Sequence, residues 1–120
     1  MRGEQHLTKP RQYALVYNEG SSWVDGLLVM KALPNGLALS RYGISVSKRV
    51  GNAVVRNRVK RLLREVLRLT PLKTGWDIVF IARLAAGSAS YVGMEKSGTG
   101  LLSRAGLLAR EDDRIGVKTD

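Results

Sequence analysis

Residues 41–69 read RYGISVSKRVGNAVVRNRVKRLLREVLRL, and this segment carries the strongest structural signals in the chain. It begins as an alternating strand, turns at Val50-Gly51-Asn52 and continues as a long basic helix. Asn52 is suited to be the N-cap, because its side-chain oxygen can accept an orphan N–H of the first turn. We expect the helix to begin at Asn52 or Ala53 and to end near Leu69, before Thr70-Pro71.

A helical wheel at about 100° per residue separates the residues of this helix into two sides. One side is apolar and can pack on a core; it carries Val55, Val59, Leu62, Leu63 and Val66. The other side is basic, with one i,i+4 row made of Arg56, Lys60, Arg64 and Arg68, and with Asn57, Arg58 and Arg61 beside it.

The positive charge of the chain is concentrated on this helix and the turn before it. Residues 48–68 hold eight basic side chains and one acidic one, a net charge of +7, whereas the whole chain carries +10. An exposed helix without a polyanionic partner would normally mix Glu with Lys at i,i+4 spacing. The pattern therefore predicts a polyanion-binding surface, with nucleic acid as the first candidate and an anionic membrane surface as the second.

The bulk composition fits one globular domain. The chain has 120 residues, of which 44% are hydrophobic, and no cysteine. The lack of cysteine excludes disulfides, thiolate metal sites and a cysteine nucleophile. No apolar run approaches the length of a transmembrane helix, and residues 1–6 lack the apolar region of a signal peptide, so we expect a cytoplasmic protein with no membrane partner.

The segment before the signature should contain one helix. We expect the polar residues 1–7 to be frayed, and a helix over residues 8–17 that Thr8 caps, with Pro10 in its first turn and a stop at Gly20. Tyr13 and Tyr17 share one face of this helix. They are either core residues or exposed rings that stack on a base.

Four strands are predicted, over residues 21–25, 27–33, 37–47 and 76–82, and the last of them should be central and covered because it is a mostly apolar run. Within the third of these, Ile44 and Val46 should face the core, and Ser45 and Ser47 should face either solvent or a ligand. Residues 91–108 should hold a final helix. Because Gly93, Gly98 and Gly100 each disfavour it by about 1 kcal/mol, we expect it to be short, broken or late-starting, with Leu101, Leu102 and Ala105 in the core. Residues 109–120 should form a flexible tail after a single domain over residues 1–108.

The sequence offers no catalytic centre. His6 is the only histidine, and it lies in a polar segment. The carboxylates show no spacing that would pair two of them, and the adjacent Glu111, Asp112 and Asp113 fit a solvated tail better than a metal site. We therefore expect no catalytic residue and no bound metal in the protein itself.

Residues 43–65, GISVSKRVGNAVVRNRVKRLLRE, resemble the signature of the bacterial ribonuclease P protein subunit, with Arg56, Asn57 and Arg58 at its R-N-R core. Weaker similarity extends from Leu7 to about Arg83. The resemblance implies an α+β two-layer sandwich in the order α-β-β-β-α-β-α. Its sheet has about four strands, with the helices mainly on one face. It also implies a left-handed β-α-β crossover and similarity to the second domain of a small-subunit ribosomal protein.

The resemblance also implies the function. Members of this family are the protein subunit of a ribonucleoprotein that removes the 5′ leader from precursor tRNA, while the RNA subunit performs catalysis with Mg²⁺. The expected partners are ribonuclease P RNA, at one protein per RNA, and precursor tRNA. A non-enzymatic protein of the same fold that binds ribosomal RNA is the alternative, and a membrane-surface or DNA-binding protein is a third.

Matching positions assign the residues to two surfaces. Contacts to the RNA subunit would come from Asn52, Arg56, Arg58, Lys60, Arg61 and Arg64. The precursor leader would bind at Tyr13, Tyr17, Val29, Lys31, Ser45, Ser47, Lys48, Arg49 and Asn57, with Arg83 nearby. Relatives can carry an aromatic residue in place of Lys31, and an arginine where this chain has His6.

Overall fold

The computed structural model describes residues 4–109 of the chain. In this part the elements follow in the order β1 (Glu4–His6), α1 (Pro10–Glu19), β2 (Ser21–Val24), β3 (Leu28–Pro34), β4 (Ser40–Ser45), α2 (Ala53–Arg68), β5 (Trp76–Ala82), the 3₁₀ helix η1 (Leu84–Ser88) and α3 (Tyr91–Arg104). Leaving aside β1 and η1, this is the predicted order α-β-β-β-α-β-α, so the predicted α+β fold is confirmed.

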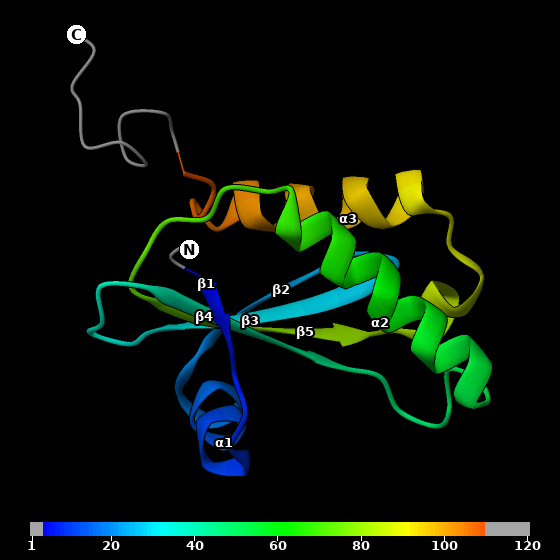
Figure 1. The fold of residues 1–120 in the computed structure, drawn as a ribbon, viewed down its shortest axis with the longest axis horizontal. Helices are drawn as coiled ribbons and strands as arrows, with labels where there is room; N and C mark the ends of the chain where they lie inside the picture. Colours follow the sequence, from blue (N-terminus) through cyan, green and yellow to red (C-terminus); the bar gives the residue numbers. More distant parts are fainter. Residues whose placement is uncertain (1–3, 110–120) are drawn as a thin grey trace, which may run out of the picture.

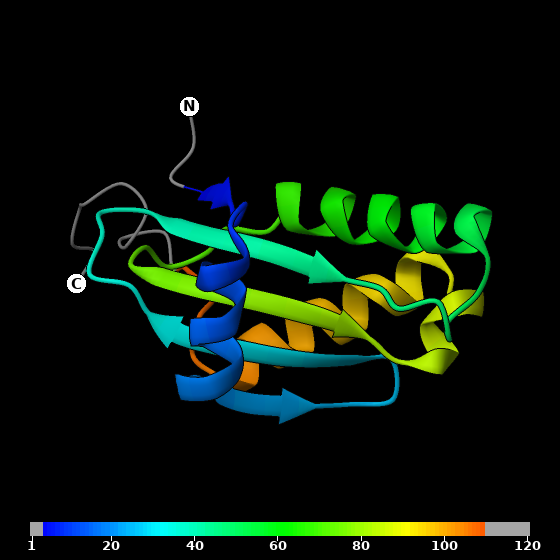
Figure 2. The same cartoon turned by 90° about the horizontal axis from the view of Figure 1, so that it is seen from below.

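The strands form one mixed sheet in the order β1-β4-β5-β3-β2. β4 pairs in parallel with β1 and with β5, whereas β3 is antiparallel to β5 and to β2. The sheet lies between α1 on one face and α2 and α3 on the other (Figure 1). In Figure 2, with α1 in front, β4 lies above β5, both point to the right, and α2 returns behind them. The β4–α2–β5 crossover is therefore left-handed, against the usual preference.

The main core fills the layer between the sheet and the helices α2 and α3. From β3 it receives the alternate residues Leu28, Met30 and Ala32, and from β5 it receives Ile78 and Phe80. The opposite face of the sheet holds a smaller cluster, in which Val16 of α1 and Leu7 cover Val79. Because strand residues alternate between faces, Val29 and Lys31 lie on the same face as α1.

An ion pair fixes the register where β4 and β5 begin. Arg41 and Asp77 are register partners, and the Arg41 guanidinium donates two hydrogen bonds, of 2.8 and 2.7 Å, to the Asp77 carboxylate. The Asn35 side chain donates a third, of 2.9 Å, from the β3–β4 loop. The bond to Asp77 raises the pKa of Arg41. Since Asp77 is buried, these three donors compensate the loss of its hydration.

The expectation that residues 1–7 are frayed is wrong for the part that the structure describes. Residues 4–6 pair with β4, the Leu7 N–H donates to the Tyr42 carbonyl at 2.8 Å, and Leu7 is buried. Thr8 is also not the cap of α1. Lys9 occupies the N-cap position, and the Gln12 side chain accepts hydrogen bonds from the Thr8 and Lys9 N–H groups.

The expectation of a short or broken final helix is wrong as well. α3 is continuous over 14 residues, with its three glycines inside it. Ser90 caps it by accepting a hydrogen bond from the Gly93 N–H, and Leu101 and Leu102 are buried as predicted. A Cβ added at Gly98 would lie 3.6 Å from Val66, an ordinary contact distance, so α3 lies directly against α2 at this point. This packing offsets the weak helix propensity.

The predicted tail, residues 109–120, lies almost wholly outside the described residues. Its first residue, Ala109, donates its N–H to the Pro71 carbonyl at 3.0 Å.

Candidate nucleic-acid interface

α2 is held against the core in a way that leaves one of its sides to solvent. Asn52 caps the helix by accepting a 3.0 Å hydrogen bond from the Val55 N–H, as predicted. The buried side chains of the helix are Val59, Leu63, Val66 and Leu67. All five of the predicted apolar positions line or adjoin the core, and Leu67 is an additional buried residue that the prediction did not include.

Three basic side chains of α2 make no hydrogen bond or ion pair with the rest of residues 4–109. We call Lys60, Arg61 and Arg64 the α2 cation row; Arg61 and Arg64 are exposed and Lys60 is half-buried. The one ion pair that α2 forms within the described chain joins Arg68 to Glu65 at 2.6 Å and lies one turn further along. The cation row therefore has its charge available for an external anion.

Other predicted contact residues of α2 are bound within the protein. Arg58 reaches away from the cation row and donates to the carbonyls of Ala89, at 2.6 Å, and Gly87, at 3.5 Å. The Arg56 Nε donates to the Gly51 carbonyl at 3.1 Å. The prediction that one arc presents all the basic residues is therefore wrong for Arg58, which ties α2 to the segment around η1.

The face of the sheet that carries α1 gathers the second predicted set. Val29 and Ser45 both pair with Ile81, so these residues form one row across β3, β5 and β4. Lys31 lies in the next row, opposite Val79. α1 crosses one part of this face (Figure 2). We call the surface made by the two tyrosines of α1 and by Val29, Lys31 and Ser45 the aromatic face.

The two tyrosines of α1 are only partly covered, although Tyr13 packs against the smaller core cluster. Val16 between them is fully buried, whereas Tyr13 is half-buried and Tyr17 is 38% exposed. Their ring centroids are 6.4 Å apart, with an angle of 56° between the ring planes. Both rings therefore present surface on which a base could stack.

The backbone of β4 and the Leu7 carbonyl hold the ring of Tyr13 in place. A Cβ added at Gly43 would lie 2.6 Å from two ring carbons of Tyr13, so the ring rests directly on the backbone of β4. The Tyr13 hydroxyl donates to the Leu7 carbonyl at 3.4 Å. Burial raises the pKa of Tyr13, and Tyr17 adds to this, whereas a hydrogen bond with the Ile44 backbone and the charge of Arg64 act in the opposite direction.

The remaining predicted residues lie at the margins of these two surfaces. Ser47, Lys48 and Arg49 are exposed in the turn after β4, and Asn57 is exposed on the first half of α2. Arg83 follows β5 and donates to the Asp25 carbonyl at 2.6 Å. They place polar and cationic groups around the end of the sheet that α1 leaves uncovered.

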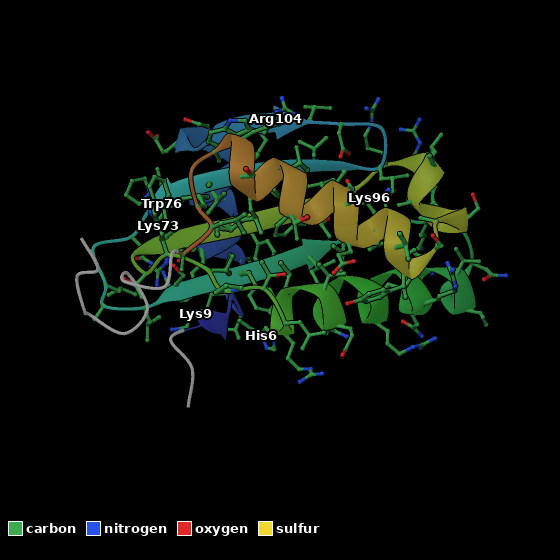
Figure 3. The ribbon with its side chains drawn as sticks, turned by 90° about the horizontal axis from the view of Figure 1, so that it is seen from above. His6, Lys9, Lys73, Trp76, Lys96 and Arg104 are labelled. Carbon is green, nitrogen blue, oxygen red and sulfur yellow. The ribbon has the colours of Figure 1, made fainter. Side chains whose placement is uncertain are left out.

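A hollow of about 270 Å³ lies between α1, the β1–β4 edge and α2. We call it the edge hollow; its lining residues are His6, Leu7, Tyr13, Tyr42, Gly43, Ile44 and Arg64. His6 stands beside the C-terminal half of α2, far from Lys96 and Arg104 on α3 (Figure 3). Sequence reasoning missed His6, Tyr42 and Gly43. The one available signal was the apolar Leu7 in an otherwise polar segment, which indicates a buried strand end.

Within residues 4–109, no group of three His, Asp or Glu side chains comes together in a way that could hold a metal ion. No helix of the described chain has the length and apolar character that crossing a membrane requires. The two surfaces offer cations for phosphates and rings for bases, which is the chemistry of single-stranded nucleic-acid binding.

Comparisons with known proteins point to the same chemistry. The family model described as Ribonuclease P matches residues 1–106. The ribonuclease P protein component of Dehalococcoides mccartyi (strain CBDB1) is 48% identical over 120 residues, which is 100% of both chains. The structure of the Staphylococcus aureus RNase P protein superposes with a TM-score of 0.80 at 30% identity, covering 87% of this chain and 97% of that one. The RNase P protein from Thermotoga maritima gives 0.74 at 30% identity, covering 83% and 96%.

Proposed function

Because the chain belongs to the ribonuclease P protein family, whose members are the protein component of the enzyme that processes the 5′ end of tRNA, we propose that it holds two RNAs side by side while the RNA subunit cuts. The family implies ribonuclease P RNA as a partner, and we add precursor tRNA as the second, at one protein per RNA. We also propose a cytoplasmic location, since bacterial tRNA precursors are made and processed there.

The RNA subunit binds along α2. The cation row supplies charges that the protein itself does not neutralise, and each phosphate that it neutralises releases counterions. Asn52 and Arg56 extend this surface toward the start of the helix. Arg58 contributes through the N–H groups that its bonds to Gly87 and Ala89 leave over, because a guanidinium has five donors.

The 5′ leader binds on the aromatic face and its margins. Tyr13 and Tyr17 stack on bases, whereas Lys31 contacts a phosphate instead of stacking. Val29 and Ser45 form the floor beside them. The margins supply further polar contacts to the leader from Ser47, Lys48, Arg49, Asn57 and Arg83. A protein that grips the leader in this way binds precursor more tightly than mature tRNA.

Catalysis belongs to the RNA subunit, with its own Mg²⁺. The protein places positive charge between two RNAs whose phosphates repel each other, and so lowers the Mg²⁺ concentration that cleavage requires. The observation that carries this proposal is a pair of surfaces on opposite faces of the sheet (Figure 1): an unneutralised cation row on α2, and on α1 the half-buried ring of Tyr13 beside the exposed ring of Tyr17.

Reconstitution tests the proposal. The protein is mixed with a bacterial ribonuclease P RNA at a low Mg²⁺ concentration at which that RNA alone is inactive, and leader removal from a precursor tRNA is followed. We expect cleavage only when the protein is present. If the protein does not restore cleavage but does bind ribosomal RNA, the alternative of a ribosomal RNA-binding protein is favoured.

A further inference from the structure

The edge hollow contains groups that neither proposed surface uses. His6 and Tyr42 form one wall, with ring centroids 4.8 Å apart in an edge-to-face arrangement and with the His6 Nε2 3.0 Å from the Tyr42 hydroxyl. Tyr13, seated on Gly43, also lines the hollow. Arg64 lines the hollow from α2, and its charge acts on the Tyr13 phenol.

This combination of rings and a cation selects its ligand. The aromatic side chains of the lining offer stacking and edge contacts to a flat ring, and the exposed guanidinium of Arg64 offers a fork of donors to a phosphate. At about 270 Å³ the hollow is smaller than the roughly 300–1,000 Å³ of pockets for drug-sized ligands, so it suits a single ring system. A base-paired duplex cannot enter it.

We propose that the edge hollow binds one unpaired nucleotide, whose base contacts the aromatic lining made by Tyr13, His6 and Tyr42 and whose phosphate meets Arg64. The inference rests on the proposed function and extends it. Tyr13 belongs to the aromatic face and Arg64 to the α2 cation row, so the hollow joins the two surfaces. The nucleotide therefore comes either from the leader or from the RNA subunit, and the chemistry of recognition is the same for both.

Photocrosslinking in the reconstituted holoenzyme distinguishes the two sources. A photoreactive phenylalanine analogue replaces His6, which is exposed, and in a second preparation it replaces Lys9, which is exposed three residues further along. The precursor leader is labelled in one arm and the RNA subunit in the other. We expect position 6, and not position 9, to crosslink at one nucleotide of one of these RNAs. Equal, scattered crosslinks from both positions, or none from position 6, would overturn the inference.

Matched variants supply a second readout in the same holoenzyme. His6→Ala and Arg64→Ala should each lower the affinity for the crosslinked RNA about tenfold, and His6→Phe should restore most of the loss in the first case, because it keeps a ring. Removing that base, by an abasic substitution, should abolish the effect of His6→Ala. Arg68→Ala removes the same charge one turn along α2, from an arginine paired with Glu65 and outside the hollow, and should cost less than twofold.

The outcomes separate this inference from the proposed function. If leader removal is restored but His6→Ala changes neither the affinity for precursor tRNA nor the affinity for the RNA subunit, the edge hollow is not a nucleotide site and the proposed function stands. If His6→Ala fails to fold, the crosslink from position 6 decides, because Arg64 also belongs to the α2 cation row and its loss would weaken RNA binding with or without the hollow. If the protein restores no leader removal, the proposed function itself fails.

Discussion

The ring of Tyr13 rests on the backbone of Gly43, so closely that a side chain at position 43 would overlap it. This relationship couples α1 to β4, the strand that leads into the basic helix. It also fixes the ring that the aromatic face and the edge hollow share.

Gly43→Ala should therefore displace Tyr13. The added methyl group meets the ring, and relieving such an overlap in a packed site costs about 1–3 kcal/mol of the free energy of unfolding. Urea unfolding measures this cost. We also expect a smaller difference in affinity between leader-bearing and mature tRNA, because the ring that would stack on the leader is moved.

Gly100→Ala is the control for this change. A Cβ at Gly100, inside α3, would meet no atom within 4 Å, so alanine should raise the free energy of unfolding by about 0.5–1 kcal/mol through helix propensity. Similar effects of the two substitutions would show that Tyr13 is not seated on Gly43.

Arg58 and Arg61 should separate stability from binding. Arg58→Ala removes hydrogen bonds to the carbonyls of Gly87 and Ala89, and we expect the free energy of unfolding to fall by about 1–3 kcal/mol. Arg61→Ala should change stability by less than about 0.5 kcal/mol, because Arg61 is exposed and binds nothing else in the described chain. It should instead reduce the salt dependence of binding to the RNA subunit, with the log–log slope falling by about 1.

Urea unfolding and binding measured over a series of salt concentrations check both expectations. An Arg58→Ala variant with unchanged stability, or an Arg61→Ala variant with an unchanged salt slope, would contradict the assignment.

Asp25 should make stability depend on pH. Burial acts to raise its pKa, but hydrogen bonds from Ser97 and from the N–H groups of Leu28 and Leu27, with the charge of Arg104, outweigh burial and lower it. A carboxylate whose pKa is lower in the folded state stabilises the fold above its unfolded pKa, about 3.9, and this contribution is lost as the pH falls through the folded pKa.

Asp25→Asn should consequently cost about 1–2 kcal/mol of the free energy of unfolding at pH 7. The difference from the unmodified protein should shrink as the pH is lowered below about 4. Thermal unfolding at pH 7, 4 and 3 measures it, with Glu19→Gln at the exposed end of α1 as the control. A difference that stays constant over this range would show that the charge of Asp25 is not what stabilises the β2–β3 turn.

The sequence was sufficient to predict the elements whose signals are local. The bounds of α2 and β5 followed from the Asn52 cap, the 3.6-residue period and the apolar run after Gly75. The left-handed crossover came from the family resemblance alone, because no pattern within β4, α2 or β5 encodes the hand of the connection.

The features that sequence reasoning missed depend on contacts between distant segments. β1 has three polar residues, and its order comes from pairing with β4. α3 is continuous because Met94, Leu101 and Leu102 are buried in the core that it shares with α2, and helix propensities ignore such packing. The helical wheel placed Arg58 among the free cations, because a wheel shows only the angles of side chains around one helix. It cannot show that the carbonyls of Gly87 in η1 and of Ala89 accept hydrogen bonds from Arg58.

Tyr17 offers the most direct test of leader binding. The sequence left open whether the tyrosines of α1 are core residues or stacking rings, and the structure shows 38% of Tyr17 exposed, next to Tyr13. Stacking of one base on one aromatic side chain contributes about 1–3 kcal/mol. Tyr17→Ala should therefore narrow the affinity gap between precursor and mature tRNA by about fivefold or more, and Tyr17→Phe should keep it.

Leu15→Ala, at another exposed position of α1, should leave the gap unchanged. Since Tyr17 is not buried, its loss should lower the free energy of unfolding by no more than about 1 kcal/mol. If the gap narrows only in proportion to lost stability, or narrows equally for Leu15→Ala, Tyr17 does not contact the leader.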